Sequence, residues 1–177
     1  MTPLVLARWS LVVVVALVLQ TTVFAELRLW GGGVVLGLVL TTAVAFSLGS
    51  NAGAVFGFIA GLLFDLFLTG TPLGLSALSY TVAGYALGSF ERSMLRQGPL
   101  VAPVIAGAGS LIALTVFVGV GALLGDAAVL SLRTLGVIVV TVLANGAVAP
   151  FVFPIAQWAM GERERSRDRV PSGWNAG

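Results

Sequence analysis

The acidic residue Asp65 stands at the end of an unusually regular apolar stretch, GAVFGFIAGLLFD at 53–65. Three glycines, Gly53, Gly57 and Gly61, precede it at four-residue spacing. Residues four apart lie on one face of a helix, and small residues on such a face let a second helix approach closely. We therefore expect a helix whose glycine face packs against a neighbour, inside the protein or on a partner, and which carries Asp65 near its end.

A carboxylate in an apolar segment faces the protein interior and finds a donor, because a charged Asp at the bilayer centre costs about 2.5–3.5 kcal/mol. The candidate donors are Thr69, Thr71, the backbone N–H groups of 70–74, Ser76 and Tyr80. Three roles fit this setting: a structural tie between the third and fourth helices, contact with a partner, and ion or proton coupling. The structural tie is the role we expect for Asp65.

The chain contains no His, Cys or Lys. Histidine general bases, thiol nucleophiles, Schiff-base lysines and disulfides are therefore absent from its chemistry. A metal site would have to use carboxylates alone, and Asp65 is the only acid inside a long apolar segment. The nine basic residues are dispersed arginines rather than a basic patch. We expect no enzyme activity, no metal, no cofactor and no nucleic-acid partner.

The composition is that of a membrane protein. Of 177 residues, 58% are apolar and only 9% are charged, with a mean hydropathy of +1.07, whereas soluble domains carry about 25% charged residues. The charge-free runs are Trp9–Ala25, Leu29–Phe64, Leu66–Phe90, Gln97–Gly125 and Thr134–Gly161. A helix crosses the bilayer with about 20 apolar residues, and runs such as LVVVVALVL lack the alternation of a barrel strand. The sequence predicts an all-α polytopic membrane protein.

Six transmembrane helices account for these runs. They are expected at 4–25, 33–48, 52–68, 72–90, 100–124 and 132–160, in a domain over 1–160 followed by a cytoplasmic, disordered tail over 161–177. The run Leu29–Phe64 would be about 54 Å long as one helix, so it is split at Gly49-Ser50-Asn51, a turn signal. Gly70-Thr71-Pro72 marks a second break.

The first helix has an alternative interpretation as a secretory signal, because Val23-Phe24-Ala25 loosely fits a cleavage site. We expect it to be retained, since the rest of the chain is membrane-embedded. Arginine placement then gives the orientation. The cytoplasmic side would hold Arg8, Arg92, Arg96, Arg163, Arg165, Arg167 and Arg169, and the outer side Arg28 and Arg133. Both termini are therefore expected in the cytoplasm.

Two further helices carry candidate packing or partner-contact residues. In the fourth helix Ser76, Tyr80, Gly84 and Gly88 repeat the four-residue spacing and could complement the glycine face of the third. In the sixth helix Asn145 can bond across helices, at about 0.6–2 kcal/mol. Pro150 and Pro154 are expected to kink that helix. Gln20, near the end of the first helix, is likewise an amide in an apolar segment that can form a hydrogen bond across helices.

The segment GFIAGLLFDLFLTGTPLGLSALSYTVAGY at 57–85 resembles the central signature of the rod shape-determining protein MreD family. The shared features are a glycine-spaced helix, an aspartate near its end, a short linker with a second Leu-Gly pair at Gly74, and a helix ending in an aromatic residue before a basic loop. Gln20 and NGAVAPFVFP at 145–154 also resemble the family, so the likeness covers about 4–160. WGGGVVLGLVL at 30–40 departs from it, because a proline is expected before the second helix.

The resemblance implies a non-enzymatic inner-membrane component of the cell-elongation (rod) complex, which scaffolds peptidoglycan synthesis and controls cell shape. The implied partners are MreC, the actin-like MreB, RodA and a class-B penicillin-binding protein, within the lipid bilayer. The family's helix arrangement is similar to that of substrate-binding subunits of energy-coupling-factor vitamin transporters. The alternative function is therefore a small-solute, vitamin-like binding or transport subunit. Its cavity would be lined by Gln20, Asp65, Tyr80, Tyr85 and Asn145.

Overall fold

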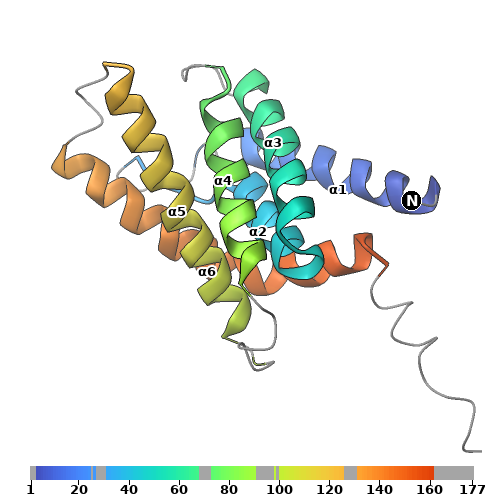
Figure 1. Ribbon diagram of the computed structural model, residues 1–177. Coiled ribbons are helices and arrows are strands. Elements are labelled where there is room, and N and C mark those ends of the chain that lie inside the picture. Colours follow the sequence, from blue (N-terminus) through green and yellow to red (C-terminus); the bar gives the residue numbers. More distant parts are fainter. Residues whose placement is uncertain are drawn as a thin grey trace, which may run out of the picture.

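The computed structural model describes residues 3–24, 26, 31–67, 73–90, 98, 100–125 and 131–161. Over these residues the chain is all-helical, with six helices and no strand, as predicted (Figure 1). The helices are α1 (Pro3–Thr22), α2 (Leu36–Leu48), α3 (Ser50–Phe67), α4 (Leu75–Ser89), α5 (Val101–Leu123) and α6 (Leu132–Ala159). The expected break at 70–72 and the tail after Gly161 lie outside the described residues.

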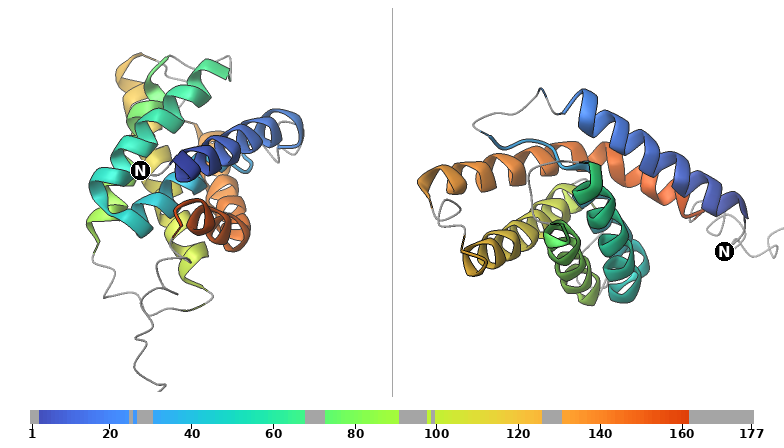
Figure 2. Two further views of the ribbon diagram at one scale, coloured as in Figure 1. Left: turned by 90° about the vertical axis from the view of Figure 1, so that its right-hand side faces the viewer. Right: turned by 90° about the horizontal axis from the view of Figure 1, so that it is seen from above.

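The helix bounds differ from the expected ranges by no more than three residues at any end. The α2–α3 break falls at the predicted turn signal, where Gly49 ends α2 with a φ of 94°. Such a left-handed backbone favours glycine because it carries no Cβ. α6 continues through Pro150 and Pro154 without a break, and Figure 2 shows it following a curved course.

Among the described residues, three helices are long and apolar enough to cross a membrane: α3 with 18 residues, α5 with 23 and α6 with 28. The Ala7–Thr22 part of α1 and the whole of α2 are apolar but shorter. The helical, membrane-like character of the prediction is therefore confirmed, whereas six separate crossings are not. The 13 residues of α2 extend only about 20 Å at 1.5 Å per residue, less than the thickness of the hydrocarbon core.

The second helix is the centre of the bundle. Eleven of the 13 residues of α2 are buried, and α2 contacts each of the other five helices. α3 and α4 form the most extensive helix pair, and α5 and α6 form a second one. Small aliphatic side chains such as Val39, Ala43 and Ala106 are fully enclosed in the core, which also contains the aromatic residues Phe64, Tyr80 and Phe153.

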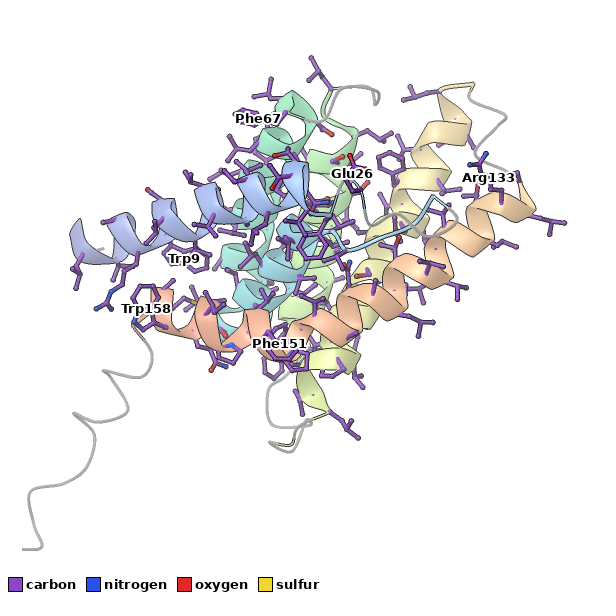
Figure 3. The ribbon with its side chains drawn as sticks, turned by 180° about the vertical axis from the view of Figure 1, so that it is seen from behind. Trp9, Glu26, Phe67, Arg133, Phe151 and Trp158 are labelled. Carbon is purple, nitrogen blue, oxygen red and sulfur yellow. The ribbon has the colours of Figure 1, made fainter. Side chains whose placement is uncertain are left out.

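The first helix packs on the bundle by one narrow face. Val12, Ala16 and Gln20, spaced by four, are buried, whereas the residues on its other faces are largely exposed. α1 contacts α2 and α6. The Arg8 guanidinium lies 5.0 Å from the centre of the Trp158 ring, and Figure 3 shows Trp158 at the end of α6 that approaches α1.

Candidate functional site

The glycine face of α3 packs against α4 inside the molecule. A Cβ added to Gly53 would lie 2.6 Å from the Gly84 carbonyl oxygen, and one added to Gly57 would lie 2.5 Å from the Tyr80 carbonyl oxygen. A Cβ on Gly61 would meet the backbone at 76–77. These distances are too short for a real side chain. The two backbones are in direct contact, and the predicted stripe is occupied by the protein's own fourth helix.

The fourth helix contributes glycines of its own to this contact. A Cβ on Gly84 would strike the Gly53 carbonyl group, and one on Gly88 would strike the backbone at 49–50. Gly53 and Gly84 therefore face each other, and the remaining glycines of the two helices each meet backbone atoms of the opposite segment. This close approach is the arrangement that small residues at four-residue spacing permit in membrane helices.

Asp65 ties the end of α3 to the start of α4. Its Oδ2 atom accepts hydrogen bonds from the backbone N–H groups of Gly74 at 2.8 Å, Ser76 at 3.1 Å and Ala77 at 3.4 Å. The first N–H groups of a helix have no partner within the helix, so an acceptor there stabilises it, and the helix dipole favours a negative charge. Gly74, with a φ of 94°, turns the chain into α4.

The donors to Asp65 are backbone groups rather than the side chains of Ser76 or Tyr80 that the sequence also offered. Thr69 and Thr71, two further candidates, lie outside the described residues. The carboxylate therefore works as a helix cap contributed by the neighbouring helix.

The other carboxylate oxygen, Asp65 Oδ1, is in a different position. It is buried, and within the described part of the chain it has no hydrogen-bond partner. The side chain as a whole is 5% exposed. A buried acceptor without a partner costs about 1–3 kcal/mol, and more if it is charged. One oxygen of the carboxylate, Oδ2, therefore has hydrogen-bond donors, whereas the other, Oδ1, has none among the described residues.

Two buried amides hold the extended segment that precedes α2. Gln20 accepts from the Leu36 N–H and donates to the Val34 carbonyl, both at 2.9 Å. Asn145 accepts from the Val35 N–H at 2.7 Å and donates to the Ser110 hydroxyl at 2.8 Å. The backbone at 34–36 thereby gains partners that a helix would otherwise supply.

A cavity of about 250 Å³ lies between these two groups of polar contacts. Its walls come from the second halves of α1, α3 and α5 and the first halves of α2, α4 and α6, so it lies at one end of the bundle. The lining residues are Gln20, Phe24, Gly31, Gly33, Val34, Val35, Leu38, Phe64, Asp65, Ser76, Ser79, Tyr80, Ala113, Leu114, Phe117, Val137 and Thr141.

The cavity brings together some of the residues that the sequence suggested for a solute site. Gln20, Asp65 and Tyr80 line it, and Asn145 lies beside it through the bond to Val35. Tyr85 does not take part, because its side chain is 56% exposed on another face of α4.

Pro150 lies elsewhere, on the outer surface of the bundle. It lines an open apolar groove of about 380 Å³ between α5 and α6, together with Pro103, Gly107, Gly146 and Ala147 among others. This groove and the cavity share no lining residue.

Sequence reasoning missed the aromatic part of the cavity wall, Phe24, Phe64 and Phe117. It also missed the role of the glycines before α2. A Cβ on Gly32 would lie 2.7 Å from the Val137 carbonyl oxygen, so the segment passes directly against α6. The triple glycine at 31–33 was the available signal for such a close approach.

Among the described residues, no three Asp or Glu side chains lie together in a group that could hold a metal ion. No family model matches the chain, and no curated protein or solved structure shows significant similarity to it. The resemblance to the MreD family therefore stays a prediction from the sequence.

Proposed function

We propose that this protein is a non-enzymatic inner-membrane scaffold of the cell-elongation complex, which organises peptidoglycan synthesis through contacts of its helix faces. The observation that supports this best is the structure of the segment behind the family resemblance. Its described parts, 57–67 and 73–85, belong to one interlocked hairpin in which the glycines and Asp65 serve packing and capping. A motif used in this way fits a structural component better than a catalyst.

The proposal includes six membrane crossings with both termini in the cytoplasm. The arginine distribution supports it. Since the chain has no Cys, single cysteines can report which side of the membrane a position faces.

Two matched positions test this orientation. Phe90 and Leu124 directly follow α4 and α5 and are each 65% exposed. A membrane-impermeant maleimide should label the Leu124→Cys variant in intact spheroplasts and the Phe90→Cys variant only after permeabilisation. Labelling of both variants from the same side would contradict the proposed topology.

The proposed partners are MreC, MreB, RodA and a class-B penicillin-binding protein. Under the proposal, the groove at Pro150 is where a partner's transmembrane helix docks, because the small residues Gly107, Gly146 and Ala147 line it and allow close approach. The glycines of α3 are not available for this, since α4 covers them.

The experiment that tests the proposal is depletion of the protein in its own rod-shaped host, combined with purification of the native membrane complex. The expected result is rounding of the cells and co-purification of MreC. Unchanged cell shape after full depletion, or a complex without cell-elongation proteins, would contradict the proposal. An Ala147→Trp variant should lose MreC while keeping its membrane abundance, whereas Val55→Trp, on the exposed side of α3, should keep MreC.

A second candidate function, a small-solute binding or transport subunit, is favoured by one observation. This is the cavity of about 250 Å³ lined by Asp65. Native mass spectrometry of the purified protein would support this function if a small molecule remained bound at stoichiometric amounts, and a ligand-free mass would count against it.

A further inference from the structure

The cavity at the end of the bundle has the size of a small organic group. A cavity of about 150 Å³ accommodates benzene, so about 250 Å³ accommodates one aromatic ring with a short chain. It is partly enclosed and lies where α1, α3 and α5 finish. Figure 1 shows the ends of α3 and α5 and the start of α4 on the same side of the molecule.

The polar side chains of the wall present little surface to an occupant. Gln20 is bonded to the backbone at 34 and 36, Ser79 donates to a carbonyl of its own helix, and Thr141 accepts from the Gly33 N–H. Asp65 caps α4 through Oδ2, and its Oδ1 atom has less than 1 Å² of accessible surface. These four side chains and that of Tyr80 are each no more than 7% exposed.

The accessible part of the wall is mainly apolar. It is formed by partly buried side chains from α5, α6, the segment before α2 and the segment after α1. Apart from the glycine backbone at 31 and 33, the polar contribution among these described residues comes from Ser76. The apolar residues are Phe24, Val34, Val35, Leu114, Phe117 and Val137.

Such a wall favours a neutral and mainly apolar occupant. A charged or strongly polar group would lose its hydration without gaining a partner from the described wall, which is costly. Water is a poor occupant for the same reason, since a bound water needs several polar partners, whereas an apolar cavity of this kind takes up a hydrocarbon. The Ser76 hydroxyl can donate to or accept from one polar group of a neutral ligand.

We propose that this cavity binds a neutral, mainly apolar group of the size of one aromatic ring with a short chain, packed against Phe24, Leu114 and Phe117. The proposal gives the second candidate function its ligand class, and it does not depend on the scaffold function. A free ring compound and the end of a lipid acyl chain share this chemistry, and the experiments below distinguish these two sources.

The first test uses 3-trifluoromethyl-3-phenyldiazirine, a neutral photolabel with a single ring, on the purified full chain in nanodiscs. Mass spectrometry after pepsin digestion should locate labelling at Leu114 and Phe117, on the cavity side of α5. An excess of 4-ethylphenol should reduce this labelling at least about tenfold, because a ligand far above its Kd fills a single site. The larger 1-hydroxypyrene, with four fused rings, should not reduce it. Labelling that neither compound reduces, or that both reduce equally, would overturn the proposal.

Two matched pairs of variants address the location. Leu114→Trp and Val137→Trp fill the cavity from α5 and from α6. Leu111→Trp and Val139→Trp place the same ring on the outer side of each helix, where these residues are 52% and 56% exposed. The filling variants should lose the labelling that 4-ethylphenol reduces, and the outer variants should keep it. Helix content and elution volume show which variants fold, and a folded filling variant that keeps this labelling would contradict the location.

A third measurement identifies the source of the bound group. The probe is a phosphatidylcholine that carries a diazirine at the end of an acyl chain. Labelling of the same α5 residues, lost in Leu114→Trp and kept in Leu111→Trp, would assign the cavity to a lipid chain, whereas labelling by the ring probe alone would assign it to a free compound. Because each probe is added to purified protein, these outcomes are independent of the cell-shape test and of whether a native molecule stays bound.

Discussion

The two helical hairpins α3–α4 and α5–α6 use the same residue types with opposite results. In α3–α4 the glycines meet the backbone of the partner helix, leaving no space for a methyl group. In α5–α6 a Cβ on Gly107 would meet Val142 Cγ1 at 3.6 Å, an ordinary contact, and one on Gly146 would lie 3.3 Å from the Pro103 carbonyl oxygen, which is closer but still longer than the contacts in α3–α4. The first hairpin is interlocked, and the second leaves an open groove on its outer side.

The caps of the two hairpins differ in the same way. The start of α4 is capped by Asp65, a buried residue of the preceding helix that is 9–12 positions away. The start of α6 is capped by Ser131, an exposed residue that accepts from the Thr134 N–H at 3.3 Å. A polar residue caps the second helix of each hairpin, whereas the four-residue glycine spacing occurs only in α3–α4. The spacing and the residues that face it, rather than the presence of a cap, distinguish the interlocked hairpin from the one with an open groove.

The largest difference between the hairpins is expected for glycine substitutions. Gly57→Ala should reduce the free energy of unfolding by about 3 kcal/mol, because the new Cβ meets backbone atoms that cannot rotate away. Gly107→Ala should be neutral or stabilising by up to about 1 kcal/mol, since alanine is the better helix former. Thermal unfolding in detergent, followed by circular dichroism, measures both. Equal melting temperatures of the two variants would contradict the conclusion that α3–α4 is packed more closely than α5–α6.

Removal of the buried cap is expected to have the next largest effect. Asp65→Ala leaves the N–H groups of Gly74, Ser76 and Ala77 without this acceptor, at a cost of about 2 kcal/mol. Asp65→Asn retains an acceptor oxygen and should keep folding, membrane abundance and most scaffold function. Chemical unfolding and a cell-shape complementation assay provide the two measurements. Rounded cells despite a normal amount of the Asp65→Asn protein would show that the scaffold itself depends on the charge.

The contact of α6 with the rest of the bundle can be tested through Asn145, which is fully buried. Asn145→Ala removes the acceptor for the Val35 N–H and the donor to Ser110. Interhelical hydrogen bonds of this kind contribute about 0.6–1.7 kcal/mol in membrane proteins, so a loss of about 1 kcal/mol is expected. Hydrogen exchange should increase at residue 35 more than within α3. Unchanged exchange there would mean that the amide does not hold the segment before α2.

The smallest effect is expected at the exposed cap. Ser131→Ala removes a local hydrogen bond at the start of α6, which is worth about 0.5–1 kcal/mol. The melting temperature should fall less than for Asp65→Ala. A larger decrease for Ser131→Ala would reverse the ranking of the two hairpins.

Much of the fold could be predicted from the sequence, because a helix in a membrane needs a continuous run of apolar residues and such a run is visible in the local sequence. Long charge-free runs such as Thr134–Gly161 predict helices, and Gly49 marks a break through its own backbone preference. The four-residue spacing from Gly53 to Asp65 predicted a shared face, because residues four apart lie on the same side of a helix. Membrane crossing was harder to predict, because the short α2 is enclosed by five helices, which the sequence does not reveal.

By itself, the sequence determined the helical, membrane-like class, the glycine face and the need of Asp65 for a donor, since each depends on neighbouring residues and on the cost of polar groups in an apolar setting. Only the tertiary structure decided that backbone N–H groups satisfy Oδ2 and leave Oδ1 without a described partner. It also decided that Phe24, Phe64, Tyr80 and Phe117 share one cavity. These residues are far apart in the chain, and only the packing of all six helices brings them together.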